Sequence, residues 1–271
     1  MSRVGVVVPT FNRYAKTKRF IECLVEQTLH DFTLYLVDSG SKDQTPSLCG
    51  EDSVDLRFIF ATPKHWWASA TNVGVTEALR DGCDLIMTIN DDAIIMPDFL
   101  EKMVATFEKN NCKILGARID YAEHPGRIWA LGAYNVWGSP YLFQLGYNNY
   151  WEEDLPAYIM CGEVIPTQAL CGGGVLISRN VFERIGFYRE KYCPQYHADT
   201  EFTLRANRQG IGTWCATHVV LYNDASYQSG AAPAVYRGPR LLRELNSLGR
   251  VFFDKKSDAY MLPVFYVSMK Y

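Results

Sequence analysis

Residues 4–109 alternate between short apolar runs and longer amphipathic stretches, and this alternation constrains the fold more than any other feature. The apolar runs predict strands at residues 4–8 (closed by Pro9), 34–37, 56–60 and 85–89. The amphipathic stretches predict helices at residues 14–26, 69–80 and 97–109. Repeated strand–helix units of this kind indicate an α/β fold, in which a mostly parallel sheet is covered by helices on both faces.

The second half of the chain has a different pattern, rich in Tyr, Trp, Gly and Pro over residues 117–168, which favours short strands and loops. A glycine-broken strand is expected next, at 169–177, then helices at 180–185 and 199–208 and an amphipathic segment at 240–251. No linker or internal repeat separates these parts. The sequence therefore predicts one domain over residues 1–225, with a C-terminal helical extension, 226–271, packed on it.

Composition narrows the classes of function. The chain has 271 residues, of which 48% are hydrophobic, enough for one large core. A net charge of −3 excludes a general nucleic-acid binder, which needs a broad cationic face. The eight cysteines include no C-x-x-C pair, which favours reduced thiols. Without a signal peptide, or an apolar stretch near the ~20 residues of a bilayer span, we expect a cytoplasmic protein, at most peripheral to the inner face of the membrane.

Polar clusters follow three of the expected strands, at residues 10–13, 38–43 and 90–92. The carboxyl ends of parallel strands meet at one edge of a sheet, where such folds bind their ligands. In the last cluster Asp91 and Asp92 are adjacent carboxylates, which repel each other unless a cation lies nearby. Such carboxylates can hold Mg²⁺ or a similar ion that also binds a diphosphate. The alternative is a pair of solvated carboxylates in a turn.

Five motifs resemble those of one enzyme family. In chain order they read VVVPTFNR, LVDSGSKDQT, WWASATNVGVTEAL, TINDDAII and CGGGVLISRN, the last continuing to ADTEFTLRANRQG. Together they resemble the nucleotide-sugar glycosyltransferases of family 2, over residues 4–210. The resemblance implies a GT-A fold, a Rossmann-like architecture in which residues 1–116 bind the nucleotide sugar and residues 117–225 bind the acceptor and carry catalysis. The motif with Trp67 and Asn72 is most similar to rhamnosyltransferase-type members.

The resemblance assigns the first strand ends to the sugar donor, a UDP- or dTDP-sugar. The residues that would line the nucleotide-base pocket are Pro9, Thr10, Phe11 and Arg13. Asp38 would accept a hydrogen bond from the ring imide of uracil or thymine, since an ionised carboxylate accepts but cannot donate. Trp67 and Asn72 would complete the nucleotide-sugar site.

The same resemblance places a divalent cation, Mg²⁺ or Mn²⁺, at the third strand end. Asn90 takes the first position of a D-x-D-type element, Asp91 would meet the ribose or sugar hydroxyls, and Asp92 would bind the cation. Asn223 takes the place of a further metal-binding histidine found in many relatives. His218 is on the same expected strand but five residues earlier, so it points to the opposite face and is interpreted as structural.

Asp199 would be the catalytic base, because an attacking hydroxyl must lose its proton as the new bond forms. Ala198 replaces the acidic residue usual before this position, which leaves Glu201 as a weaker second candidate. Helix capping is the alternative role for Asp199. Gly173, Gly174 and His197 would contact the acceptor. The run of three glycines lacks the P-loop pattern, and a bulged strand is its alternative interpretation.

These assignments predict an inverting glycosyltransferase whose acceptor is a glycan or a lipid-linked oligosaccharide. The alternatives are an inactive carbohydrate- or nucleotide-binding relative and a sugar-phosphate nucleotidyltransferase, which would need a glycine-rich loop after the first strand. The extension has leucines on one side and three arginines at positions 240, 243 and 250. It could dock on the domain, on a second copy in a homodimer or on an anionic membrane, and so few basic residues favour protein docking.

Overall fold

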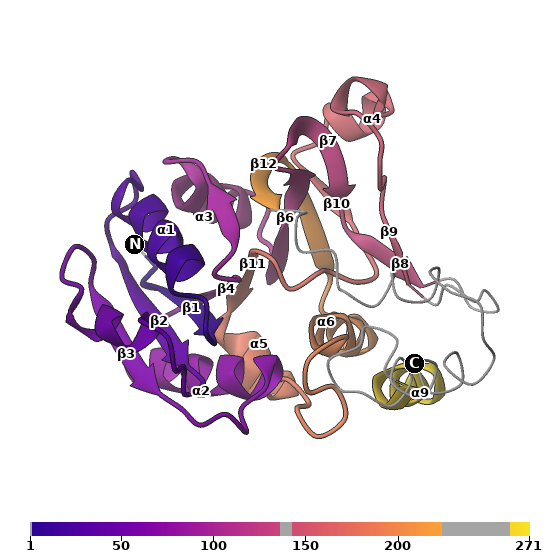
Figure 1. The fold of residues 1–271 in the computed structure, drawn as a ribbon. Coiled ribbons are helices and arrows are strands. Elements are labelled where there is room, and N and C mark those ends of the chain that lie inside the picture. The colour runs from indigo at the N-terminus through magenta and orange to yellow at the C-terminus, as the bar shows by residue number, and fades with distance from the viewer. Residues whose placement is uncertain (1, 136–142, 224–260) are drawn as a thin grey trace, which may run out of the picture.

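The structure, a computed structural model, describes residues 2–135, 143–223 and 261–271 (Figure 1). At its centre is a ten-stranded sheet with the order β10-β12-β6-β11-β4-β1-β2-β3, in which β5 also pairs with β12 and β7 with β6. The strands of this sheet are β1 (Val4–Thr10), β2 (Phe32–Asp38), β3 (Leu56–Phe60), β4 (Leu85–Thr88), β5 (Ala93–Ile95), β6 (Ile114–Tyr121), β7 (His124–Ala130), β10 (Val164–Pro166), β11 (Val175–Ser178) and β12 (Thr213–Asn223). A separate ladder joins β8 (Ala133–Asn135) to β9 (Phe143–Leu145).

The helices follow the strands much as the alternation predicts. They are α1 (Tyr14–Val25), α2 (Trp67–Arg80), α3 (Phe99–Lys109), α4 (Ala157–Met160), α5 (Arg179–Ile185), α6 (Ala198–Arg208) and α9 (Met261–Lys270), with 3₁₀ turns η1 (Thr45–Gly50) and η2 (Glu152–Asp154). Within the described ranges, every helix is too short or too polar to cross a bilayer.

The parallel part of the sheet aligns the ends of its first strands. β1 pairs in parallel with β2 and with β4, and β2 with β3. In this register Thr10 lies opposite Asp38, and Thr88 lies opposite Val7. The carboxyl ends of β1, β2 and β4 therefore share one edge, and the three polar clusters follow them there. The predicted α/β fold, with a large, mostly parallel sheet, is confirmed.

Two hydrophobic cores lie on opposite faces of the sheet. Along β1 the side chains alternate, so that Val7 packs with α2, α5 and α6, whereas Val6 and Val8 pack with α1 and α3. Figure 1 shows these two groups of helices on either side of the strands. Every residue of β2 is buried, as expected for a parallel strand covered on both faces.

The second half of the chain enters the same sheet through antiparallel strands. β11 lies between β4 and β6 and is antiparallel to both. β12 is parallel to β6 but antiparallel to β5 and β10. Residues 1–116 and 117–225, distinguished in the sequence by their patterns, thus contribute strands to one continuous sheet.

Several predicted strand boundaries were wrong, and two of them have a clear physical cause. The first strand does not close before Pro9, because β1 continues to Thr10. β4 pairs with β1 only as far as Val7, so Pro9 has a neighbouring strand on one side alone and its missing N–H interrupts no second ladder. The strand expected at 169–177 begins only at Val175. Gly174 has a φ of +78°, and a Cβ there would lie 2.4 Å from Leu221, which explains a glycine and a break at this point.

The amphipathic segment expected at 240–251 lies outside the described residues. Within the part of the extension that the structure describes, α9 lies beside α6 (Figure 1). Val267 of α9 is fully buried and belongs to the same core cluster as Phe202 of α6.

Candidate active site

The adjacent carboxylates Asp91 and Asp92 form an acidic corner just beyond β4, and Arg13 lies between them. Its Nη1 is 3.1 Å from Asp91 Oδ1 and its Nη2 is 2.5 Å from Asp92 Oδ2. Thr10 and Thr17 donate to the other oxygen of Asp91, at 2.9 and 3.2 Å. Asp91 is only 1% exposed, and this burial raises its pKa to about 6 although Arg13 acts in the opposite direction. A side-chain cation therefore separates the two carboxylates.

The loops after β1 and β2 are joined to each other beside this corner. Ser39 N donates to Thr10 O at 3.0 Å, and Lys42 N donates to the side-chain oxygen of Asn12 at 2.7 Å. Asn12 is in the left-handed region, with a φ of 53°. Asp38 is buried and accepts from the backbone and hydroxyl of Ser41. The residues assigned to the base pocket (Pro9, Thr10, Phe11 and Asp38) thus lie together, with Phe11 47% exposed.

A tryptophan connects the acidic corner to the second half of the chain. Trp67 is the first residue of α2, and its Nε1 donates to the side-chain oxygen of Asn90 at 2.8 Å. Its ring packs edge-on against Tyr188 at 5.4 Å. Asn72 lies farther along α2, where its amide is bonded to the main chain of Tyr188 and does not contact the acidic corner. The structure therefore brings Trp67, but not Asn72, to the strand ends.

Asp199 lies on the other side of Trp67, in the first turn of α6. Gly172 lies between Trp67 and Asp199 and is close to both. A Cβ on Gly172 would lie 3.0 Å from Trp67 Cζ2 and 3.1 Å from Asp199 Oδ2. Burial raises the pKa of Asp199, while hydrogen bonds from the Thr200 and Gly172 backbones act to lower it. Asn90, Trp67 and Gly172 thus form a continuous path of contacts from the acidic corner to Asp199.

The residues predicted to contact the acceptor do not all lie together: His197 is at the start of α6, whereas Gly173 and Gly174 lie against β6 and β12. His197 precedes the helix with a φ of 62°, and its ring lies 4.9 Å from that of Phe143. Gly173 follows Gly172, and Gly174 bonds through its backbone to β4 and β6. Glu201, the weaker base candidate, is fully buried and paired with Arg189 and Arg205. Its partners leave Asp199 as the better placed carboxylate.

The metal-ligand candidates are sparse. Among residues 2–135, 143–223 and 261–271 there is no group of three or more His, Cys, Asp or Glu side chains that could hold an ion. The Asp92 side chain is 14% exposed, and Asn223 ends β12 opposite Ala93, the residue after Asp92. His218 is exposed, near Thr106 Oγ1 at 3.4 Å. A carboxylate and an amide oxygen are ligand types that a hard cation accepts, but Arg13 is paired with Asp92 in this arrangement.

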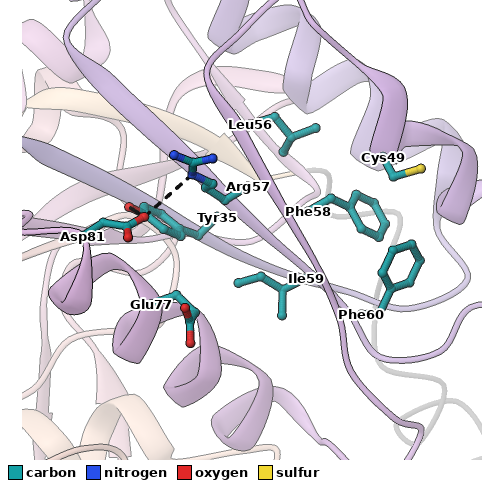
Figure 2. A pocket seen from close by; sticks show the side chains of 9 residues that line it. All are labelled: Tyr35, Cys49, Leu56, Arg57, Phe58, Ile59, Phe60, Glu77 and Asp81. Carbon is teal, nitrogen blue, oxygen red and sulfur yellow. Dashed lines mark hydrogen bonds and ion pairs between the residues drawn. The ribbon is translucent and has the colours of Figure 1, made fainter.

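A separate pocket of about 440 Å³ lies at the β3 edge of the sheet and shares no residue with this site (Figure 2). Its polar side chains include Arg57 and Asp81, which lie 3.7 Å apart, and Glu77 from α2. We assign it no part in the candidate active site.

Comparison with known proteins gives the family. Residues 5–186 match the model of "Glycosyl transferase family 2". The chain belongs to glycosyl transferase family 2. A relative in Sinorhizobium fredii, the uncharacterized protein y4gI, is 23% identical over 91% of this chain. An uncharacterized glycosyltransferase of Haemophilus influenzae is 25% identical over 46% of it. The family 2 chain spans 27% and 39% of the lengths of these two relatives.

Solved glycosyltransferases share the fold at low sequence identity. GalNAc-T7, solved with UDP, GalNAc and Mn²⁺, superposes with a TM-score of 0.68 at 14% identity, covering 99% of this chain and 55% of its own. The mannosyltransferase PcManGT from Pyrobaculum calidifontis, in complex with GDP-Man and Mn²⁺, gives 0.59 at 16% identity, covering 100% of this chain and 76% of its own. These similarities confirm the predicted GT-A fold of this family 2 chain.

Two features of the site were missed from the sequence. Arg13 was assigned to the base pocket, yet its guanidinium pairs with both carboxylates of the acidic corner. The sequence offered one indication of this contact, because Arg13 follows the first strand and so lies at the same edge of the sheet as the carboxylates. Gly172 was grouped with its two neighbours, and nothing in the sequence indicated that its missing side chain brings Trp67 and Asp199 together.

Proposed function

We propose that this family 2 glycosyltransferase is an inverting enzyme that transfers a sugar from a UDP- or dTDP-sugar to a hydroxyl of a glycan or lipid-linked oligosaccharide. The observation that carries the proposal is the continuous path of contacts from the acidic corner through Trp67 and Gly172 to Asp199. A donor whose diphosphate lies at the corner would place its sugar toward that carboxylate.

In this mechanism Asp199 accepts the proton of the acceptor hydroxyl while the oxygen attacks the anomeric carbon from the face opposite the diphosphate. Burial raises the pKa of Asp199, which suits a group that must accept a proton. Asp38 would bind the imide of the base, and Asp92 with Asn223 would hold the cation. Asp91 is 1% exposed and bonded to Arg13, Thr10 and Thr17, so it would not contact the donor hydroxyls directly. A divalent cation there would neutralise charge on the departing diphosphate.

The acceptor side would be formed by Gly173, His197 and the aromatic segment after β9. That segment exposes Tyr150, Trp151 and Tyr158, by 51%, 43% and 71% of their surfaces. Tyr147 links two of them, because its ring lies 5.7 Å from that of Tyr150 and its hydroxyl 3.1 Å from that of Tyr158, and a contiguous exposed apolar patch commonly marks a binding surface. These aromatic rings are suited to the apolar faces of sugar rings, which supports a saccharide acceptor.

The direct test is a panel of nucleotide sugars with Mn²⁺ and saccharide acceptors. We expect one UDP- or dTDP-sugar to raise the unfolding temperature, because a ligand selective for the folded state stabilises it. With acceptor, the same donor should yield free UDP or dTDP and a product of inverted anomeric configuration. We also expect EDTA to abolish release, with activity restored by Mn²⁺. A product of retained configuration would contradict the proposal.

A second candidate, an inactive nucleotide-sugar-binding protein, is favoured by one observation. Arg13 is bonded to the Asp92 oxygen that a cation would need, and Asn90 already weakens the acidic motif. This candidate predicts the same thermal stabilisation by donor without release of nucleotide for any acceptor.

A further inference from the structure

The first turn of α6, which carries Asp199, also carries a carboxylate with an unusual environment. Glu201 has no exposed surface. Arg205 forms a two-pronged pair with it, Nε to Oε1 and Nη2 to Oε2, both at 3.1 Å. Arg189 Nε lies 3.4 Å from Oε1. Such a buried, charge-paired cluster fixes geometry strongly, since loss of any partner leaves a charge without compensation.

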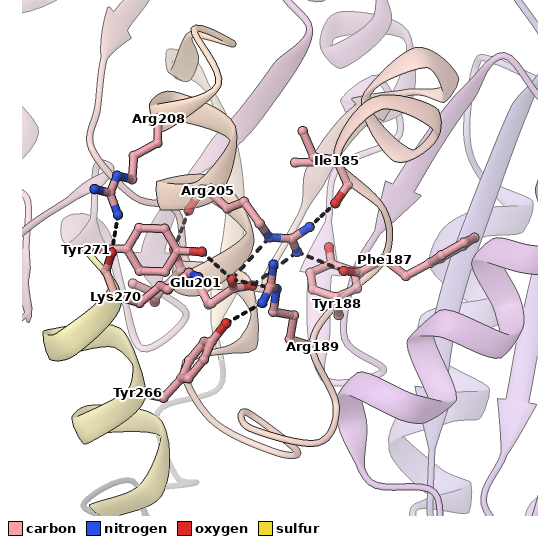
Figure 3. A network of polar contacts seen from close by, with 12 residues as sticks. Ile185, Phe187, Tyr188, Arg189, Glu201, Arg205, Arg208, Tyr266, Lys270 and Tyr271 are labelled. Carbon is pink, nitrogen blue, oxygen red and sulfur yellow. Dashed lines mark hydrogen bonds and ion pairs between the residues drawn. The ribbon is translucent and has the colours of Figure 1, made fainter.

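The cluster is completed by Tyr266 of α9 and by Tyr271, the residue that follows α9. Tyr271 donates its hydroxyl to Glu201 Oε1 at 2.5 Å, and Arg189 donates to the hydroxyl of Tyr266 at 2.5 Å. Figure 3 shows Tyr266 from α9, and Tyr271 at its end, pointing into the arginine cluster. The Tyr266 ring also stacks on Tyr192, 4.3 Å away and 7° from parallel. At the end of α6, Arg208 contacts the Lys270 carbonyl and lies over the Tyr271 ring.

The segment that α9 holds continues to the donor side of the site. Beyond Tyr192, the Pro194 carbonyl accepts from Ala68 N at 3.0 Å and the Gln195 side chain accepts from Trp67 N at 3.1 Å. Trp67 in turn binds Asn90. Residues 187–197 thus connect α9, the base-bearing helix α6 and the start of α2.

We infer that α9 is a brace for catalysis, and that Tyr266 and Tyr271, through Arg189 and Glu201, are positioning residues for Asp199. The inference rests on the proposed function, since it gives Asp199 the role of base. None of these four residues touches the donor or acceptor in this scheme. They act by fixing α6 and residues 187–197 relative to Trp67. A displacement of about 1 Å in a reacting group can cost about a hundred-fold in rate.

The test is the double variant Tyr266→Phe/Tyr271→Phe. It keeps both rings, and therefore the stack on Tyr192 and the contact with Arg208, but removes both hydroxyls from the cluster. We expect kcat to fall about ten- to a hundred-fold, with the donor KM changed less than about two-fold because the acidic corner is untouched. Hydrogen exchange of the backbone amides of residues 198–208 should become faster.

The matched control is Tyr35→Phe. Tyr35 also donates its hydroxyl to a carboxylate, Asp81 Oδ2, at 2.9 Å, but in the β3-edge pocket away from the site. We expect this variant to lower stability while leaving kcat and the exchange of residues 198–208 unchanged. If the double variant does not fold, Tyr271→Phe alone is measured in the same way.

Any one of three results would contradict the inference that α9 positions Asp199. They are an unchanged kcat in the folded double variant, unchanged exchange over residues 198–208, and equal losses in the double variant and the Tyr35→Phe control. Failure of the proposed function is distinguishable, because the wild-type chain would then turn over no donor at all. The exchange experiment would still decide whether α9 holds α6.

Discussion

Replacing Asp199 with asparagine is expected to lower kcat by about 10²- to 10⁴-fold, the usual contribution of a general base. Asparagine has nearly the same shape and keeps one oxygen that can accept a hydrogen bond from the Thr200 backbone, but it cannot take up a proton. Since Asp199 acts only in the transition state, binding of UDP or dTDP with Mn²⁺, measured by calorimetry, should change little. Equal losses in binding and turnover would assign Asp199 to donor binding instead.

The wild-type pH profile gives an independent check of the same role. Asp199 must be ionised to accept a proton, so kcat should fall as the pH drops through its pKa. Burial raises that pKa, and the acidic limb should therefore lie above the ordinary aspartate value of about 3.9. Asp98→Asn is the matched control, because Asp98 is a surface carboxylate 45% exposed and paired with Lys102. This variant should leave both kcat and the acidic limb of its pH profile unchanged.

Replacing Arg13 with alanine is expected to lower the free energy of unfolding by about 3 kcal/mol at pH 8 in EDTA. Removing one partner of a buried ion pair typically costs about 3–5 kcal/mol, and the 29% exposure of the Arg13 side chain places the effect at the lower end. Asp91, 1% exposed, would keep its two threonine donors but lose its counter-ion. Urea unfolding monitored by fluorescence measures the loss.

The loss should shrink at pH 5. Below a pKa of about 6, Asp91 is mostly protonated and needs no counter-ion. Arg80→Ala provides the contrast, because Arg80 is 69% exposed and pairs with Glu77 on the surface of α2. That change should cost less than about 1 kcal/mol at either pH. Similar losses for the two arginines would show that the acidic corner is open to solvent and that Arg13 does not sustain it.

The fold could be predicted from the sequence where an apolar run in the sequence corresponds to a strand that is buried in the structure. The apolar runs of β1, β2 and β4 are covered on both faces, so their sequences are continuously apolar and their ends polar, and the helices between the strands have one apolar side. β11 was harder, because its four residues follow three glycines and its antiparallel placement between β4 and β6 depends on contacts over nearly ninety residues of sequence. The end of β1 was predicted too early because of Pro9. A proline destabilises a strand only where its missing N–H would have bonded to a neighbouring strand, and the sequence does not reveal whether a second strand lies alongside.

The site was predictable as a set of strand ends but not as a set of contacts. Asp38, Asp91 and Asp92 follow strands whose ends align, so their gathering at one edge follows from topology. Arg13 bridges two of these carboxylates only because of the conformation of its long side chain. Gly172 allows Trp67 and Asp199 to approach each other only because it has no side chain. Glu201 could be ranked below Asp199 from sequence, yet its arginine and tyrosine partners come from three separate segments.

The place of β11 in the sheet has a consequence for synthesis of the chain on the ribosome. β4 can pair with β1 early, but its other edge is open until residues 175–178 have been translated, well past the middle of the polypeptide. An open strand edge is a template for aberrant association between nascent chains. We therefore expect chaperones to bind the chain during translation. We also expect poor recovery of any fragment that ends before Ser178, because such a fragment leaves β4 with an open edge.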